Sequence, residues 1–262
     1  MTVDRCPGVH DIGAGLVGCP ELSAIPWLRH GSTTRGGFEP HEDRAMDVAR
    51  VMRCSGLPPL PIVHAHQKHT ANVALVDSAM GRTLSAGRVH AFEETDAIVC
   101  AAPGVVTAVF TADCVPVFLV DTRRRITALA HAGWKGTLAR IAGRTVRVMM
   151  DAGSDAADIT AWIGPCISGG NYEVSAEMVA EFSQEFGDAT TAGVPFASGR
   201  LLDLPALNVF TLVKSGLDPE RIHRSGICTF GERSRFYSYR GDGGTRGRIV
   251  SFMVVLDQAQ AP

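Results

Sequence analysis

The feature that most constrains the fold is a series of short apolar, β-branched stretches in the middle of the chain. Each is bounded by Asp, Gly, Pro or a cluster of charges, as strands usually are. The stretches predict strands at 73–77, 97–101, 105–110, 115–120 and 126–130. Because they are nearly continuous rather than alternating, we expect several to be covered on both faces by helices. The pattern therefore predicts a central mixed β-sheet packed by helices.

Three later segments have the apolar periodicity of helices. The first covers 138–150 and ends before Gly153, and the second covers 174–186 and ends at Gly187. In the third, Asp203 can cap the helix, Pro205 lies in the first turn, and a glycine follows the end. We interpret these apolar stripes as core rather than as a cofactor-binding element. The fold class is α/β, of the α+β type.

No repeat, low-complexity tract or linker divides the 262 residues, so we expect a single domain over 1–262. The first sixty residues are rich in turn formers. A loop is predicted at 31–40, and 55–61 closes this region before a strand begins. Irregular structure is expected to dominate there.

Charge and hydropathy exclude several classes of protein. A net charge of −2 offers no basic field for nucleic acid. No apolar run approaches the roughly 18 residues that span a bilayer, and the N-terminus lacks the order of a signal peptide. We therefore expect a cytoplasmic protein with no nucleic-acid or membrane partner. Seven cysteines without a repeating spacing predict free thiols rather than a disulfide framework.

Reactive side chains concentrate in three segments: HAHQKHT (64–70), TADC (111–114) and HAGWKG (131–136). The last two lie at predicted strand ends, where α/β proteins commonly place their sites. Histidine nitrogen and cysteine sulfur are ligands that zinc prefers, and three of them leave a fourth position open. Copper is the alternative metal. Spacing alone does not fix the ligands, because Cys114 could be a core residue and the histidines could belong to a solvated loop.

Six motifs in order resemble the laccase-domain family, also called polyphenol oxidase or peptidoglycan editing factor proteins. The resemblance covers most of residues 30–255. Its motifs are QKH (67–69), TADCVPVFLVD (111–121), AHAGWKGT (130–137), IGPCISGGNYEV (163–174), RIHRSGICT (221–229) and FYSYRGDGGTRGR (236–248).

The resemblance implies a single α/β-type domain and zinc bound by His69, Cys114 and His131, in preference to His64 and His66. It also implies purine nucleoside chemistry: phosphorolysis of adenosine, inosine, guanosine or methylthioadenosine, and deamination of adenosine. A zinc-bound water would attack C6 in the deamination.

Further site residues are candidates on chemical grounds. Phosphorolysis needs cations for phosphate, and Arg35, Lys135 and Arg240 each lie in a family motif. Arg240 belongs to a glycine-rich segment, 240–248, that is either a plain loop or an anion-binding nest. Asp113 is a candidate proton carrier or ligand-supporting residue, although strand alternation would aim it away from Cys114. Gln67 binds either the substrate or its own loop.

The sequence departs from the family pattern at several positions. Phe38 follows Gly37, Thr70 follows the QKH motif, Gly170-Asn171-Tyr172 replaces a Cys-Cys-Tyr variant, and Gly231 stands for a second cysteine. None of these removes a predicted ligand, but the first leaves substrate specificity open.

Three other functions remain open from the residues. Cys114 activated by His131 could be the nucleophile of an amidohydrolase acting on a cell-wall peptide precursor. A zinc-stabilised binding module would need a fourth protein ligand, for which only His64 or His66 is available. A copper-dependent polyphenol oxidase is the third alternative, and the sequence does not predict the oligomeric state.

Overall fold

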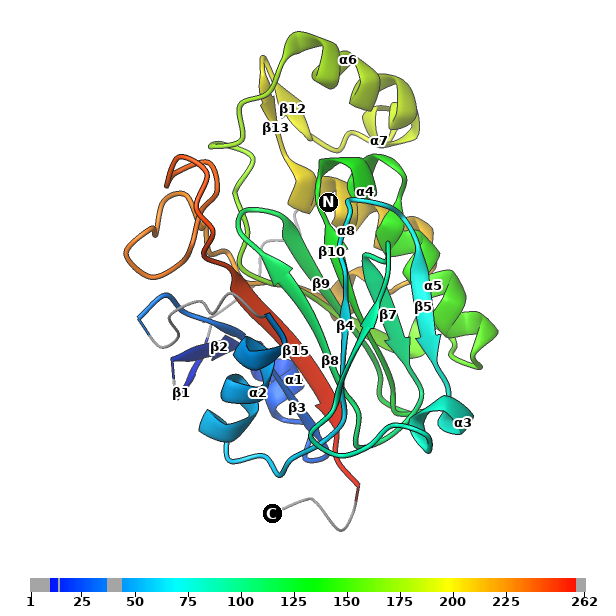
Figure 1. Cartoon of the computed structure of the whole chain (residues 1–262). Coiled ribbons are helices and arrows are strands. Elements are labelled where there is room, and N and C mark those ends of the chain that lie inside the picture. Colours follow the sequence, from blue (N-terminus) through cyan, green and yellow to red (C-terminus); the bar gives the residue numbers. More distant parts are fainter. Residues whose placement is uncertain (1–9, 14, 37–43, 258–262) are drawn as a thin grey trace.

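The computed structural model describes residues 10–13, 15–36 and 44–257, and most of their strands form two mixed sheets (Figure 1). The first sheet has seven strands, ordered β1 (His10–Gly13), β2 (Leu16–Gly18), β3 (Leu28–Thr33), β15 (Ile249–Val255), β8 (Val106–Thr111), β4 (Ile62–Ala65) and β6 (Val89–Phe92). Neighbours from β1 to β8 are antiparallel, whereas β4 runs parallel to β8 and β6.

The second sheet has six strands. They are ordered β14 (Ile222–Arg224), β11 (Ile159–Ile163), β9 (Val115–Asp121), β10 (Ile126–Ala132), β7 (Ala97–Cys100) and β5 (Val73–Val76). The four central strands are antiparallel, and the edge strands β14 and β5 run parallel to their neighbours.

Helices lie on both outer sides of the two sheets. The chain order is α1 (Pro20–Ser23), α2 (Arg44–Cys54), α3 (Ser78–Gly81), α4 (Trp134–Leu138), α5 (Ile141–Asp151), α6 (Ala176–Glu185), α7 (Gly187–Thr191) and α8 (Leu204–Lys214), with single 3-10 turns at Ala156–Asp158 and Pro219–Arg221.

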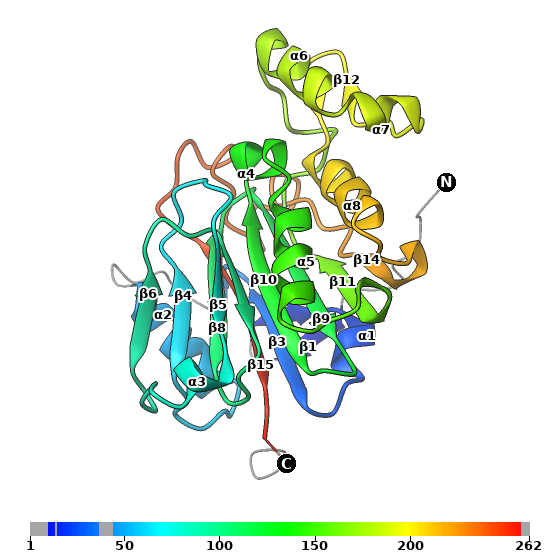
Figure 2. The same cartoon turned by 90° about the vertical axis from the view of Figure 1, so that its right-hand side faces the viewer.

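The core has three apolar layers. Between the sheets, Met253 of β15 belongs to the same buried cluster as Phe118 of β9. Outside the first sheet, Val51 of α2 packs with Phe252 of β15. Outside the second sheet, α5 and α8 bury side chains such as Met149 (Figure 2). The order of layers is therefore α2, first sheet, second sheet, then α5 with α8.

The five predicted strands are present as β5, β7, β8, β9 and β10, each within two residues of its predicted ends. The expectation that helices cover both of their faces is wrong. Four of the five lie in the second sheet, with helices on one face and the first sheet on the other. A continuous apolar strand indicates burial of both faces, but it does not identify the covering layer.

The predicted helices are confirmed with two corrections. The first is broken into α4 and α5 at Arg140, whose φ of 56° ends one helix and starts the next. The second ends at Glu185, just before Gly187 as predicted, but it begins at Ala176, and a further helix, α7, begins at Gly187 directly after Phe186. The third is confirmed in detail, since the Asp203 side chain caps α8 by accepting from the N–H of Ala206 at 2.8 Å.

The expectation of irregular structure in the first sixty residues is wrong. Three strands and two helices lie among the described residues of this region, and β3 includes residues 31–33 of the predicted loop. β3 is polar yet buried because β15 satisfies its hydroxyls: Ser32 Oγ bonds Ser251 Oγ at 2.8 Å, and Thr33 Oγ1 accepts from the N–H of Val250 at 2.9 Å. Residues 37–40, including Phe38, lie outside the described residues.

Residues 176–202 form a lobe that projects from one end of the sheets (Figures 1 and 2). It contains α6, α7 and the hairpin of β12 (Ala197–Ser198) and β13 (Leu201–Leu202). The segments through which the chain enters and leaves the lobe lie side by side. The N–H of Val174 donates to Arg200 O at 2.9 Å, and the N–H of Leu202 donates to Tyr172 O at 3.0 Å. These two segments, residues 172–174 and 200–202, form the neck of the lobe.

No helix among the described residues is long and apolar enough to cross a bilayer. The described cysteines, Cys19, Cys54, Cys100, Cys114, Cys166 and Cys228, are all free.

Candidate metal centre and substrate site

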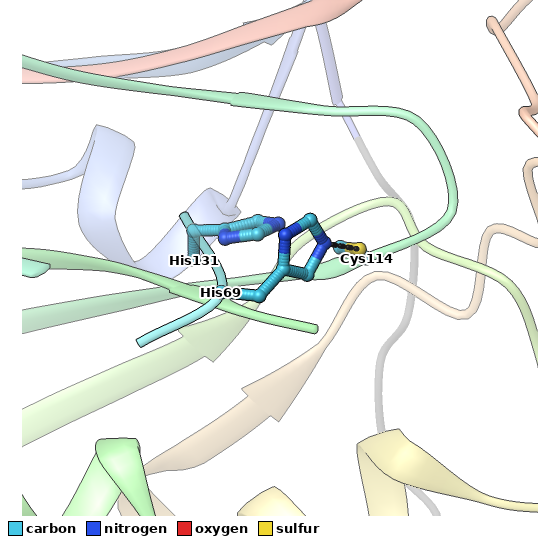
Figure 3. Close-up of side chains that lie close together, drawn as sticks. All are labelled: His69, Cys114 and His131. Carbon is cyan, nitrogen blue, oxygen red and sulfur yellow. Dashed lines mark hydrogen bonds between the residues drawn. The ribbon is translucent and has the colours of Figure 1, made fainter. Parts of the chain in front are cut away.

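The structure brings His69, Cys114 and His131 together at one end of the sheets (Figure 3). His69 lies in the connection from β4 to β5, Cys114 directly precedes β9, and His131 is in β10. Their ligand atoms all lie within 4.8 Å of one another, with 3.9 Å between Cys114 Sγ and His69 Nε2. This arrangement is suited to hold a metal ion.

The neighbouring histidines do not join the group. His64 is in β4 rather than in the solvated loop that the sequence allowed, and its ring packs edge-on against Phe110 with centroids 5.6 Å apart. His66 interacts through Nδ1 with the carboxylate of Glu93. The structure therefore separates His69 from both of its neighbours.

Asp96, which sequence reasoning missed, organises two of the three predicted ligands. Its fully buried carboxylate accepts from His131 Nδ1 at 2.8 Å and from the main-chain N–H groups of Lys68, His69 and Thr70 at 3.2, 3.1 and 2.7 Å. The Thr70 hydroxyl adds a fifth donor at 2.7 Å. Asp96 thus fixes both the ring of His131 and the backbone that carries His69. Its only sequence signal is a carboxylate at the start of a predicted apolar strand.

Neighbouring groups shift the pKa values of Cys114, His131 and Asp96. Burial raises the pKa of Cys114, but the charge of His131 and hydrogen bonds from His131 and His69 outweigh burial and lower it to about 6. Burial lowers the pKa of His131, but the Cys114 thiolate and the bond to Asp96 raise it to about 9. For Asp96, burial is outweighed by bonds from His131 and Thr70, so its pKa falls to about 2. Without a metal, the site holds a thiolate beside an imidazolium.

The backbone around the group is constrained. His69 and Asp113 have φ values of 58° and 82°, a region that costs non-glycine residues energy and persists only where surrounding contacts enforce it. Gly133 follows β10, and a Cβ there would lie 2.7 Å from His69 Cδ2 and 3.1 Å from Cys114 Sγ. Only glycine allows these two side chains to approach the β10–α4 connection so closely.

Asp113 and Gln67 are engaged with protein groups. The Asp113 carboxylate accepts from the Thr229 hydroxyl at 2.6 Å and from the main-chain N–H of Arg240 at 2.7 Å. The Gln67 amide donates to Phe110 O and accepts from Phe110 N–H, both at 2.7 Å. Asp113 therefore connects the Cys114 turn to residues 229 and 240, and Gln67 connects the His69 loop to β8.

The three predicted cations have different surroundings. Arg35 donates to the Asp242 carboxylate at 3.1 and 3.2 Å, and its guanidinium lies 4.8 Å from the Tyr237 ring centroid. Lys135 is exposed, with Nζ 5.4 Å from the Trp134 ring centroid. Arg240 is exposed and donates to Glu173 O at 2.7 Å. Within the described chain, no contact joins Arg35 to the His-Cys-His group.

Tyr172 is a second residue that sequence reasoning did not assign to the site. The Arg240 guanidinium lies 5.3 Å from its ring centroid. Burial, followed by the negative charge of Cys114, raises the pKa of the Tyr172 phenol to about 12. The half-buried ring thus lies within the electrostatic reach of Cys114, at the neck of the lobe. In the sequence this position lies in the motif at 163–174 and in a departure from the family pattern, without a role in the site.

Residues 39–256 match the family model described as multi-copper polyphenol oxidoreductase laccase. The chain belongs to this family. The match confirms the resemblance drawn from the six motifs.

Two curated relatives have names that state an enzyme activity. The purine nucleoside phosphorylase YlmD of Bacillus subtilis is 39% identical over 194 residues, 73% of this chain and 69% of that protein. The adenosine deaminase RL5, from an unknown prokaryotic organism, is 35% identical over 192 residues, 72% of this chain and 73% of its own length.

Solved structures share the fold. A hypothetical protein, YfiH, of Bacillus licheniformis superposes with a TM-score of 0.78 at 28% identity, covering 94% of this chain and 98% of that one. YlmD of Geobacillus stearothermophilus superposes with a TM-score of 0.74 at 27% identity, covering 93% and 97%. The two-sheet architecture is therefore that of the family.

Proposed function

We propose that this chain is a zinc-dependent purine nucleoside enzyme that phosphorolyses adenosine, inosine, guanosine or methylthioadenosine and deaminates adenosine. The observation that carries the proposal is the His69, Cys114 and His131 group, supported by buried Asp96, in a chain whose relatives include a purine nucleoside phosphorylase and an adenosine deaminase. Its partners would be small molecules, a purine nucleoside and phosphate, and we propose a cytoplasmic location.

The donor set supports zinc over copper. Two imidazoles and one thiolate are ligands that zinc binds with three protein atoms in catalytic sites. The lowered pKa of Cys114 supplies the thiolate that a metal requires. The described residues contain one group of three clustered ligand atoms, whereas multicopper chemistry would need more than one such group. The laccase term in the family description is therefore not our preferred activity.

For deamination, zinc would lower the pKa of a water molecule in the open fourth position, for attack at C6 of the purine. The chain's own groups prepare this position. Asp96 holds His131 through Nδ1, which leaves Nε2 as the nitrogen available for a metal. It also holds the loop that presents His69. We assign Asp113 a positioning role rather than proton transfer, because both of its oxygens accept hydrogen bonds from the protein.

For phosphorolysis, the exposed cations Arg240 and Lys135 would bind phosphate beside C1′ of the ribose. The main chain of Arg240 is fixed by Asp113, the neighbour of Cys114, so its side chain extends from a residue tied to the metal centre. Arg35 would act indirectly, since its partner Asp242 accepts from the main-chain N–H of Ser238 and so helps fix the same loop. Gln67 would likewise keep the His69 loop against β8.

One observation favours a second candidate. The metal-free site has the ionised cysteine, the histidine and the buried aspartate that an amidohydrolase with a Cys-His pair would need. This enzyme would work without a metal, so metal dependence separates the two proposals.

The test combines metal analysis with a nucleoside assay. Purified protein is incubated with adenosine and phosphate, and adenine and inosine are followed by chromatography. Cys114→Ala is compared with Cys54→Ala, a matched control, because Cys54 is an exposed thiol on α2. We expect about one zinc per chain in the wild type and in the control, and loss of zinc and of both products in Cys114→Ala. Full activity after exhaustive chelation would refute the proposal and support the thiol nucleophile.

A further inference from the structure

A pocket of about 590 Å³ lies on the outer side of the second sheet, between α5 and α8. None of the His-Cys-His residues lines it. Its volume is in the range of small-molecule sites. Its lining residues are Leu138, Ala139, Arg140, Gly143, Arg144, Arg147, Glu185, Thr211, Lys214 and Ser215.

Close packing of the two helices forms part of the pocket's wall. A Cβ on Gly143 of α5 would lie 3.0 Å from Ser215 Oγ and 3.1 Å from Thr211 Cγ2, both contributed by the end of α8. Both hydroxyls donate to helical carbonyls, Ser215 to Thr211 O and Thr211 to Leu207 O, each at 2.8 Å. Thr211 and Ser215 therefore line this part of the pocket with small, neutral hydroxyl side chains.

The charges around the pocket have one predominant sign. Four lining side chains are cationic and one is a carboxylate, in a chain whose net charge is −2. The carboxylate, Glu185, is already bound by Arg140, with Nε to Oε1 at 3.1 Å. Arg147 pairs within its own helix with Asp151 at 3.1 Å. Arg140 and Arg147 are thus neutralised locally, and the excess charge belongs to the other two cations.

Arg144 and Lys214 are the uncommitted cations, one from each helix. Arg144 donates through Nε to Ala139 O at 3.0 Å, and its two terminal nitrogens have no partner among the described residues. The ammonium group of Lys214 has no ion pair or hydrogen bond within the described part of the chain. Like-charged groups facing one pocket from two helices favour binding of an anion, and guanidinium with ammonium suits phosphate oxygens.

We propose that this pocket binds a diphosphate-bearing small molecule, held by Arg144 of α5 and Lys214 of α8. The volume exceeds what a single phosphate group would fill, and two separate cations match two linked phosphate groups. The diphosphate is carried by a nucleotide or is inorganic pyrophosphate. This site is independent of the proposed nucleoside chemistry, because it shares no residue with the metal centre.

Calorimetric titration of the metal-loaded full chain with pyrophosphate, with ADP and with orthophosphate tests the proposal. The double variant Arg144→Ala/Lys214→Ala is compared with Arg82→Ala/Arg88→Ala, which removes two exposed cations near α3 and β6. We expect pyrophosphate and ADP to bind the wild type and the control equally, and the pocket variant to lose about tenfold or more in affinity, because charge-assisted contacts are lost.

Comparison of the ADP and pyrophosphate titrations distinguishes a nucleotide from inorganic pyrophosphate as the ligand. Tighter binding of ADP than of pyrophosphate assigns the remaining volume to a nucleoside, whereas equal affinities assign the site to the inorganic ion. Adenosine turnover of the pocket variant at saturating phosphate should equal that of the wild type. The binding measurement does not depend on adenosine turnover, so it tests the pocket even if the nucleoside proposal fails. An absence of saturable binding, or equal affinities in the two double variants, would overturn the proposal.

Discussion

At the scale of single residues, the site depends on groups that are not ligands. Asp96 receives five hydrogen bonds and fixes two of the three metal-binding candidates at once. Gly133 leaves the space into which His69 and Cys114 fit. Both residues position the metal-binding candidates, so their replacement should reduce metal affinity more than it reduces the stability of the fold.

Asp96→Asn should reduce zinc affinity by about 10- to 100-fold, because groups that orient metal ligands typically contribute that much. Zinc affinity is measured by competition with a chromophoric chelator. Asp121→Asn is the matched control, since Asp121 is equally buried but lies at the other end of β9, where Oδ1 accepts from the main-chain N–H of Arg123 and Arg124. Equal zinc affinities in the two variants would show that Asp96 has no special role.

Gly133→Ala should abolish stoichiometric zinc, because the new Cβ would lie within 3.1 Å of Cys114 Sγ and even closer to His69. Gly170→Ala is the control, as no atom lies within 4 Å of a Cβ there. Metal content after gel filtration distinguishes them. Normal zinc in Gly133→Ala would mean that the β10–α4 connection moves freely away from the ligands.

The residues also show where sequence reasoning succeeds. Cys114 and His131 stand in distinctive segments at strand ends, and the ordered motifs selected His69 from three nearby histidines. Asp96 could not be predicted, because its role depends on a loop of residues 68–70 and a strand residue, His131, meeting in space. The same holds for Tyr172, whose proximity to Cys114 depends on the path of the chain into the lobe.

At the scale of secondary-structure elements, local sequence signals predict where helices begin and end. Tertiary contacts accompany the departures from these predictions. α8 follows its signals because Asp203 caps it and it ends directly before Ser215 and Gly216. The predicted helix at 138–150 is broken at Arg140, whose side chain donates a hydrogen bond to Glu185 O of the lobe. β3 was not predicted because its polar residues are satisfied by a strand more than two hundred positions away.

Arg140→Ala should release the lobe. Arg140 donates to the Glu185 carboxylate at 3.1 Å and to Asp188 at 2.9 Å, and its guanidinium lies 4.3 Å from the Phe186 ring centroid. We expect faster hydrogen exchange and proteolysis in α6 and α7, with unchanged zinc content.

Arg147→Ala is the control for this prediction, because Arg147 is exposed on α5, the helix that follows Arg140, and among the described residues its ion pair is with Asp151 of that helix. Exposed pairs of this kind contribute about 0–1 kcal/mol, so exchange in the lobe should stay unchanged. Equal protection of the lobe in the wild type and Arg140→Ala would contradict the assignment of Arg140 as its anchor.

At the scale of the whole molecule, the candidate metal centre lies where the chain passes between the sheets. The connection from β4 to β5 and the connection from β8 to β9 both lead from the first sheet to the second, and they carry His69 and Cys114. The apolar stretches predicted β5, β8 and β9, but neither β4 nor the division of the strands between two sheets. That division depends on which strands pair, which single-strand patterns do not encode.

The packing of the whole molecule predicts which thiols react. Burial raises the pKa of Cys100 to about 11 and raises those of Cys19 and Cys166 still further, so at neutral pH these thiols are protonated and shielded. Cys114, with its pKa lowered to about 6, is a thiolate at neutral pH once the metal is removed.

Iodoacetamide labelling of the native chain, followed by mass spectrometry, checks this. Exposed Cys54 should react under all conditions. Cys114 should react only after chelation, at a rate that falls as the pH drops through about 6, because protonation removes the thiolate. Cys19, Cys100 and Cys166 should react only on unfolding. Labelling of Cys114 at the same rate with and without chelator would exclude it as a metal ligand.

The lobe of residues 176–202 is joined to the rest of the molecule through two neighbouring segments. Its two ends leave the body side by side, joined by hydrogen bonds between residues 172–174 and 200–202. A segment with adjacent ends can be exchanged for another of different length without altering the sheets beneath it. Tyr172 stands at that junction, within the electrostatic reach of Cys114. We therefore expect the lobe to tolerate changes in length without displacing the two sheets or the His69, Cys114 and His131 group.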